Sequence, residues 1–460
     1  MSEDVKSLKD EAGNEGGFFE KFFKLSANGT NVRTEIIAGI TTFLTMSYII
    51  IVNPLVVADT GMPIPSVMIA TCLSAAFATM MMGLLANYPF ALAPGMGLNA
   101  YFAMVVTMNP NITWETALGA VFISGVVFFI LSLVKFREMI IDAVPQCMKD
   151  AIPAGIGLFI AIIGMKNAGI VEIIGSGSDA LLTLGSFGDK STLLAGIGLL
   201  LTSVLLALKF RGAILVGILL TALIGGFPFF GLTQWTGKIM ELPSFADWSL
   251  VLGKLNIVDA MGLGLFSVIF VFLMVDMFDT IGTLIGVSGQ GNFLKDGKLE
   301  RVNEALISDS VGTMVGAVFG TPTVTSYIES AAGVAAGGRT GLTAVVVSIL
   351  FVIALLFGPV VGMIPGAATA PALIIVGSMM MSSVTKIDWS DFSLSIPAFL
   401  TIVAMPFTSS IANGIAFGFI SYSIIGLFTG KAKEVHWLTY VLAGAFVLKF
   451  VLQAMGYLVI

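Results

Sequence analysis

Residues 264–287 read GLFSVIFVFLMVDMFDTIGTLIGV, an apolar run of membrane-spanning length that carries two carboxylates, Asp276 and Asp279. A third carboxylate, Glu329, lies in the small-residue stretch Gly320–Gly338. An ionisable group at bilayer depth costs several kcal/mol unless it is paired or faces a cavity. Three acids in two such segments therefore predict a polar site inside a membrane protein, and they favour a transporter of a small polar solute.

The whole chain has the composition of a membrane protein, since 57% of its 460 residues are apolar and 11% are charged. A helix of about 20 apolar residues spans the hydrocarbon core. Open sheet edges cannot face lipid, so we expect an all-α polytopic bundle. About fourteen spans are predicted, at 34–58, 66–86, 88–108, 114–134, 150–173, 192–209, 211–230, 262–287, 303–320, 322–337, 340–363, 367–385, 396–409 and 410–429. Whether the further apolar run 437–460 spans the membrane stays open.

The basic residues between the spans predict the orientation of the chain. With a cytoplasmic N-terminal tail, residues 1–33, most loop Lys and Arg fall on the cytoplasmic side, as the positive-inside rule requires. These residues are Lys135, Arg137, Lys149, Lys209, Arg211, Lys295, Lys298, Arg301, Arg339, Lys386, Lys431 and Lys433. The opposite loops carry only Lys190, Lys238 and Lys254. We expect a multi-pass protein of the cell membrane, and no basic patch indicates nucleic acid.

A weak internal match divides the spans into two repeats. Gly83 and Gly316 are 233 residues apart (316 − 83 = 233), and Pro89 and Pro322 have the same spacing. A repeat of seven spans, an odd number, must be inverted in the membrane, and inverted repeats are typical of secondary transporters. The repeats are predicted at 34–230 and 262–429. They flank a linker, 231–261, with an interfacial helix, and 430–460 follows as an apolar segment of uncertain placement.

Two spans open with sequences that do not suit a continuous helix. Tyr88-Pro-Phe-Ala-Leu-Ala-Pro-Gly-Met-Gly begins one, and Thr321-Pro-Thr-Val-Thr-Ser-Tyr-Ile-Glu begins the other. Proline removes an amide donor, and β-branched residues favour extended backbone. We predict a short extended strand followed by a half-helix in each, with freed amides and a positive helix end aimed at a polar solute. Ordinary proline kinks are the alternative.

Several side chains near these breaks are candidate ligands. Asp276 and Asp279 share one helix face, and Glu329 begins the second half-helix. Burial favours the protonated form of a carboxyl, so such groups can carry a proton, or one of them can only bond a neighbouring helix. Asn99 can bond a solute or cross-link helices. Two aromatic rings, Phe90 and Tyr327, can stack on a flat ring or serve packing.

Three stretches of this sequence resemble the nucleobase permeases, most closely their hypoxanthine/guanine/adenine branch. They are Leu273-Met-Val-Asp-Met-Phe-Asp-Thr-Ile-Gly-Thr, Ala93-Pro-Gly-Met-Gly-Leu-Asn-Ala-Tyr-Phe and Gly320-Thr-Pro-Thr-Val-Thr-Ser-Tyr-Ile-Glu-Ser. The similarity extends from about Phe18 to about Leu427. The run after Lys433 exceeds the fourteen-segment pattern of that family.

The resemblance implies two inverted repeats whose spans sort into a core domain and a gate domain. The core would hold spans 34–134 and 262–363, and the gate 150–230 and 367–429. By motif, Asp276 and Glu329 would contact a purine, Asp279 and Asn99 would support binding, Asp279 and Asp276 would couple protons, and Phe90 and Tyr327 would line the ring.

The implied activity is proton-coupled uptake of a purine nucleobase, namely hypoxanthine, guanine or adenine. The alternative is an anion transporter or channel on a similar fold, although three acids would repel an anion. An enzyme is disfavoured, because no nucleophile motif, phosphate-binding loop or metal cluster is evident, and we expect no cofactor. The choice of purine, proton or sodium coupling and the oligomeric state stay open, with a homodimer as one option.

Overall fold

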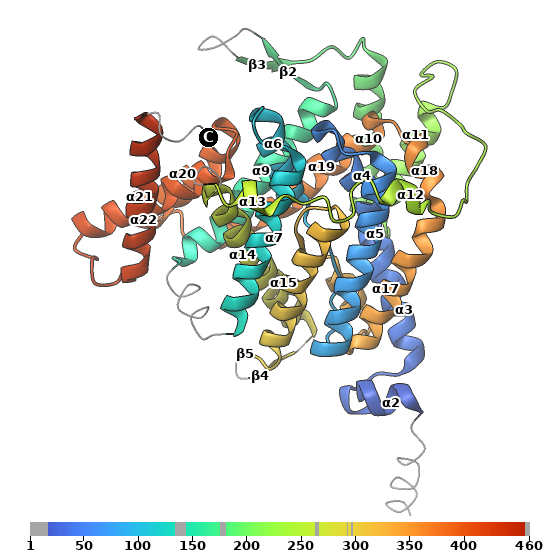
Figure 1. Ribbon diagram of the computed structural model, residues 1–460, viewed down its shortest axis with the longest axis horizontal. Helices are drawn as coiled ribbons and strands as arrows, with labels where there is room; N and C mark the ends of the chain where they lie inside the picture. The colour runs from blue at the N-terminus through green and yellow to red at the C-terminus, as the bar shows by residue number, and fades with distance from the viewer. Residues whose placement is uncertain are drawn as a thin grey trace, which may run out of the picture.

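The computed structural model describes residues 17–133, 144–174, 181–262, 266–291, 293–295 and 298–455 (Figure 1). The chain is a bundle of helices with three short two-stranded sheets in the described part. The all-α polytopic prediction is therefore confirmed. Residues 1–16 of the predicted tail and the loop cations Lys135 and Arg137 lie outside the described residues.

Each predicted span of the first repeat coincides with helical structure. The first span is broken at Ser47 and Tyr48, two residues in a turn conformation. The elements are α3 (Val32–Met46), α4 (Ile49–Val57), α5 (Ile64–Met81) with a π-helical turn (Met82–Ala86), β1 (Leu92–Pro94), α6 (Met96–Met108), α7 (Trp114–Leu133), α9 (Gln146–Asn167), α10 (Lys190–Ala207) and α11 (Ala213–Gly225).

The second repeat follows the same order after the linker, which forms two short helices, α12 (Phe245–Trp248) and α13 (Ile257–Ala260). Its elements are α14 (Phe266–Gly291), α15 (Val302–Phe319), β6 (Val324–Ser326), α16 (Ser330–Ala335), α17 (Gly341–Ala354), α18 (Gly358–Met363), α19 (Gly366–Met380) with a 3₁₀ segment, η7 (Met381–Lys386), α20 (Phe392–Phe407) and α21 (Ile411–Phe428). A further helix, α22 (Trp437–Ala454), packs against α21.

The two predicted breaks meet at the middle of the bundle. β1 pairs antiparallel with β6, in the register Leu92↔Ser326, Ala93↔Thr325 and Pro94↔Val324. The half-helices α6 and α16 begin directly after these strands. All six strand residues are buried, so the extended backbone satisfies its hydrogen bonds inside protein, as the lipid environment requires.

The remaining short elements mark the two ends of the molecule. The hairpin β2 (Val171–Ile174) and β3 (Leu181–Leu184) lies at one end. The hairpin β4 (Leu294–Lys295) and β5 (Lys298–Leu299) lies at the other end, with the N-terminal helix α2 (Phe18–Phe23), as Figure 1 shows. This arrangement matches the predicted topology, in which the N-terminus and the loop at Lys295 share one side.

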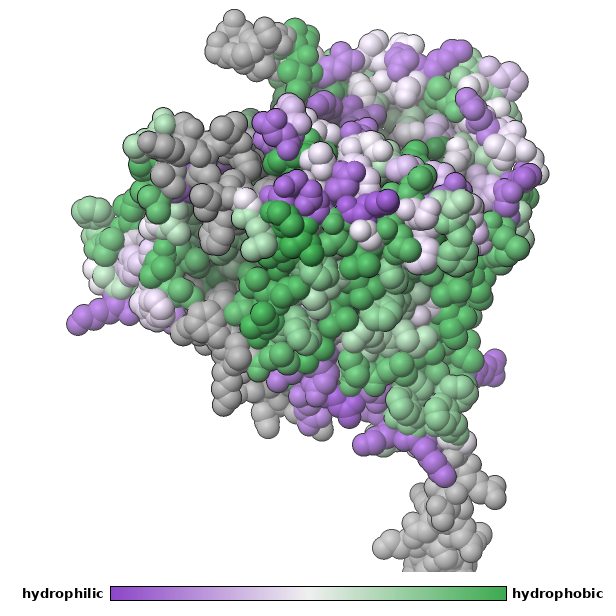
Figure 2. Space-filling view, in the orientation of Figure 1, coloured by the Kyte–Doolittle hydropathy of each residue, from purple (hydrophilic) through white to green (hydrophobic). Residues whose placement is uncertain are grey.

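Surface hydropathy indicates where lipid contacts the bundle. Figure 2 shows a broad hydrophobic belt between two hydrophilic ends. Among the described residues, nine helices are long and apolar enough to cross a bilayer, and four shorter apolar helices include α6, α11 and α20. The fourth is Trp437–Val451 within α22, the helix formed by the last apolar run.

One buried carboxylate links the two repeats. Glu35 Oε1 accepts a hydrogen bond from the Arg339 backbone N–H at 2.8 Å. Its Oε2 accepts from the N–H of Thr340 at 3.3 Å, and from the N–H and Oγ1 of Thr343 at 3.1 and 2.6 Å. These donors lie at or just before the start of α17, where a carboxylate from another element can cap the helix. Glu35 therefore fixes α3 against α17.

Candidate functional site

A cavity of about 560 Å³ lies where the strand pair, α14, α9 and α19 meet. The beginnings of both half-helices reach it, through Gly95–Gly97 on one side and Tyr327–Glu329 on the other. Its polar wall comes from α14, β6 and the start of α16, namely Asp279, Thr283, Thr325, Ser326, Tyr327 and Glu329. The cavity is thus built on the two breaks that the sequence predicts.

The mouth of this cavity has a different character from its inner wall. Lys149 and Asp150 contribute from the start of α9, and Ser382, Ser383 and Lys386 contribute from η7. Gln146 Nε2 donates to Asp150 Oδ2 at 3.0 Å. Asp279 and Glu329 therefore lie on the wall built from the broken spans, whereas Asp150 and two lysines lie on the side of the predicted cytoplasmic loops.

Glu329 is held by the first span. Its Oε1 accepts a hydrogen bond from the Tyr48 hydroxyl at 2.8 Å. Thr45 Oγ1 lies 3.4 Å from the Glu329 carbonyl oxygen and donates to it. Tyr48 is a cavity-lining residue that the sequence did not single out, because an aromatic residue in an apolar span carries no distinguishing pattern. Only its position opposite Glu329 marks it.

Asp279 and Asp276 point to different surroundings. Asp279 lines the cavity. Asp276 is 1% exposed and is not one of the lining residues. Thr313 Oγ1 of α15 lies 3.0 Å from Asp276 Oδ2 and 2.8 Å from the Val324 carbonyl oxygen. Asp276 therefore faces α15 and β6, behind the cavity wall.

A second buried carboxyl, Asp309 of α15, lies in the same polar layer. Thr280 Oγ1 donates to Asp309 Oδ1 at 2.7 Å, and Thr280 Oγ1 also lies 2.7 Å from Thr325 Oγ1. Among the described residues, Asp276 Oδ1 and Asp309 Oδ2 have no hydrogen-bond partner. Such orphaned buried atoms need an explanation in a native structure, and a proton on either carboxyl would provide one.

Asn99 and Phe90 lie away from the cavity wall. Asn99 is fully buried, and neither polar atom of its side chain has a partner within the described part of the chain. Phe90 is 1% exposed and stacks on Tyr88 at a centroid distance of 5.1 Å, with its edge toward Phe293 at 5.8 Å. Tyr327 does line the cavity, and its hydroxyl donates to the Pro94 carbonyl oxygen.

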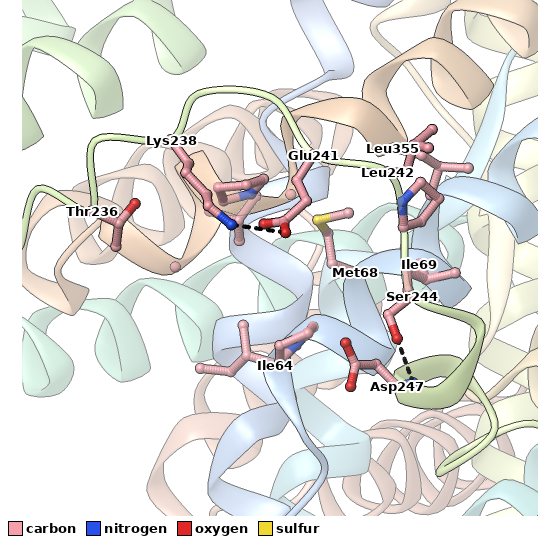
Figure 3. A pocket seen from close by; sticks show the side chains of 16 residues that line it. Ile64, Met68, Ile69, Thr236, Lys238, Glu241, Leu242, Ser244, Asp247 and Leu355 are labelled. Carbon is pink, nitrogen blue, oxygen red and sulfur yellow. Dashed lines mark hydrogen bonds and ion pairs between the residues drawn. The ribbon is translucent and has the colours of Figure 1, made fainter.

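A second pocket, of about 460 Å³, lies between the start of α5, the linker and α18 (Figure 3). Lys238 Nζ and Glu241 Oε1, three residues apart in the linker, pair beside it at 3.0 Å. Ser244 Oγ accepts from the Asp247 backbone N–H at 3.3 Å. This pocket lies away from the two broken spans and from Asp279 and Glu329, so the central cavity remains the candidate site.

The fold and the central site together define a multi-pass membrane transporter rather than an enzyme. Residues 33–454 match the model of the permease family Xan_ur_permease. The chain belongs to this family, which is the nucleobase/ascorbate transporter family.

Three relatives match nearly their whole length. A putative permease of Methanocaldococcus jannaschii is 52% identical over 94% of this chain and 98% of its own. The guanine/hypoxanthine permease PbuO of Bacillus subtilis is 46% identical, over 92% and 98%. The adenine permease AdeQ of Escherichia coli is 44% identical, over 96% and 98%.

Two solved structures share the fold at low identity. The transmembrane domain of the cyanobacterial bicarbonate transporter BicA has a TM-score of 0.60 at 16% identity, covering 83% of this chain and 97% of that one. The murine anion transporter Slc26a9 in its inward-facing state has a TM-score of 0.61 at 12% identity, covering 86% and 68%. These similarities establish the two-inverted-repeat fold.

Proposed function

We propose that this permease takes up purine nucleobases, namely hypoxanthine, guanine or adenine, together with protons across the cell membrane. The observation that carries the proposal is the pair of carboxylates, Asp279 and Glu329, on the wall of a cavity formed at the two broken spans. The names of the relatives PbuO and AdeQ support a purine substrate.

The chemistry of the inner wall suits a flat heterocycle with N–H groups. Carboxylate oxygens accept hydrogen bonds from ring and exocyclic N–H groups, and such charge-assisted bonds are the stronger kind. Ser326 and Thr325 add hydroxyls at the same wall, and the ring of Tyr327 supplies an aromatic surface. The two acids disfavour an anion, since like charges repel strongly away from bulk water.

Proton coupling is assigned to the carboxyls of α14. Asp279 lies at the cavity, where it can exchange a proton as the substrate binds. Asp276 lies behind it in the layer with Asp309, where a shared proton would relieve the repulsion between two buried acids. Asn99 supports binding through the start of α6 rather than through the cavity wall.

The two sets of helices around the cavity support alternating access as the mechanism. The proposed core contributes α14, β6 and both half-helices, and the proposed gate contributes α9, α19 and η7. The mouth beside Lys149 and Lys386 belongs to the predicted cytoplasmic loops, so this conformation is assigned as inward-facing. Movement of the core against the gate would close this mouth and open the other side.

Uptake of labelled hypoxanthine tests the proposal directly. The chain is expressed in cells that lack purine permeases, and initial rates are measured with and without a protonophore. We expect uptake that the protonophore abolishes and that unlabelled guanine or adenine inhibits. Uptake of bicarbonate or sulfate without purine uptake would refute the proposal, and purine uptake that follows a sodium gradient would refute its proton component.

A further inference from the structure

We propose that Tyr48 is a positioning residue that orients Glu329 for the base and keeps it ionised. The inference rests on the proposed function, because Glu329 is taken as a substrate ligand. It adds a residue of the first span to a site that the sequence places on three other spans. Its basis is the hydrogen bond from the Tyr48 hydroxyl to Glu329 Oε1, 2.8 Å long, at the cavity wall.

The break in the first span is what brings Tyr48 to the cavity. α3 ends at Met46 and α4 begins at Ile49, so Tyr48 occupies the joint. The N–H groups of Ile50 and Ile51 bond three residues back, to Ser47 and Tyr48. This tighter turn shifts the helical phase. The tyrosine ring, 1% exposed, is held by packing while its hydroxyl reaches Glu329.

Close packing of α3 on α16 makes the contact part of the framework. A methyl group at Gly333 would overlap Thr42 Oγ1 and would lie 2.8 Å from the Ala38 carbonyl oxygen. One turn further along α3, Thr45 Oγ1 donates to the Glu329 carbonyl oxygen. The first span therefore holds both the backbone and the carboxylate of residue 329, and these groups move together.

The repeat symmetry shows that the fold does not require this pair. At the spacing of 233 residues, Tyr48 corresponds to Ile281 and Glu329 corresponds to Met96. The symmetry-related contact would therefore join Ile281 of the second repeat to Met96 of the first, and both residues are apolar, although each repeat forms a strand and a half-helix. A hydrogen bond found at only one of two symmetry-related contacts between the repeats points to a specialised role at the site.

Electrostatics indicates what the hydroxyl contributes. Glu329 faces Asp279 of α14, which repels it, and Tyr327 on its own segment. Asp150, Lys149 and Lys386 lie at the mouth of the same cavity. Tyr48 donates to the ionised form of Glu329 and so favours it. With Oε1 engaged, Oε2 remains available to accept an N–H of the base.

Tyr48→Phe removes the hydroxyl and keeps the ring. Binding of hypoxanthine to the purified permease is measured between pH 5 and 8, since binding is free of the changing driving force that affects uptake. We expect Kd to rise about tenfold, the typical effect of losing a hydrogen bond to a charged group. We also expect the loss of binding at acid pH to begin about one pH unit higher.

Two further variants make the test specific. Tyr101→Phe removes a hydroxyl from a buried ring of α6 that packs on Phe272 and is not one of the lining residues, and it should match the wild type. In a Glu329→Gln background, Tyr48→Phe should change neither Kd nor the pH profile further. An unchanged Kd and pH profile in Tyr48→Phe, or the same loss in both backgrounds, would overturn the proposal. Absence of purine binding by the wild type would instead refute the proposed function.

Discussion

A disulfide between α6 and α9 should stop transport by tying the proposed core to the proposed gate. A Cβ atom at Gly97 would lie 3.9 Å from Ile156 Cβ. Disulfides need a Cβ separation of about 3.5–4.5 Å, so Gly97→Cys with Ile156→Cys satisfies the geometry in this conformation. The native thiols, Cys72 and Cys147, are both free and buried, and alanine replaces them in the parent.

The size of the effect follows from the reach of the bridge. A disulfide holds its two Cα atoms within about 6.8 Å, so any opening of the contact beyond that distance is blocked. Uptake by the oxidised pair should fall to the level of cells without the permease, and a reductant should restore it. A methyl group at Gly97 would lie 2.5 Å from Ile156 Cγ2. The reduced double-cysteine variant lacks the Ile156 Cγ2 methyl and so avoids this clash. Gly97→Cys alone keeps it and should therefore transport more slowly than the reduced pair.

The assay compares initial hypoxanthine uptake before oxidation, after oxidation and after reduction. Both single-cysteine variants and the cysteine-free parent receive the same oxidant, and none should lose uptake on oxidation. Closure of the bridge is verified by mass spectrometry of the purified protein. Undiminished uptake with the bridge closed would show that α6 and α9 do not separate at this point during transport.

Four other substitutions separate the roles of the acids inside the bundle. Glu329→Gln should raise KM for hypoxanthine by roughly tenfold or more, the effect of losing a charge-assisted hydrogen bond, and an unchanged KM at normal surface expression would remove Glu329 from the site. Asp276→Asn should leave uptake insensitive to a protonophore or abolish it, and Asp279→Asn should also raise KM. If the double Asn variant stays fully driven by the pH gradient, the proton carrier lies elsewhere. Glu35→Gln should cost about 1.5–3 kcal/mol of stability by removing one acceptor without changing KM, whereas the exposed Glu172→Gln should leave the unfolding temperature in detergent unaltered.

The sequence predicts the architecture well because its signals are local. Pro89, Pro94 and Pro322 remove donors from a helix, and Thr321–Thr325 favours extended backbone, so both strand and half-helix units follow from short stretches. The pairing of β1 with β6 is different. Its register joins residues more than two hundred positions apart, and it depends on how two inverted halves pack around one axis.

The division of labour between the acids of α14 depends on the same long-range packing. Spacing places Asp276 and Asp279 on one face, but a helix face covers a wide arc, and its edges can meet different neighbours. Thr313 of α15 donates a hydrogen bond to Asp276, whereas Asp279 lines the cavity. The sequence therefore predicts that both acids matter. The role of each depends on which element packs against its side of the helix, and the sequence does not predict that.

Tyr48 shows why a ligand's support is harder to predict than the ligand. A carboxylate inside an apolar span is conspicuous, since its burial requires compensation. The group that compensates it can be any donor on any neighbouring element, and Tyr48 lies 281 positions away from Glu329. Because the helix break at Ser47 and Tyr48 has no proline of its own, nothing local indicates that the ring turns toward the cavity. The cost of burying Glu329 is thus visible in the sequence, while the interaction that offsets it appears only in the fold.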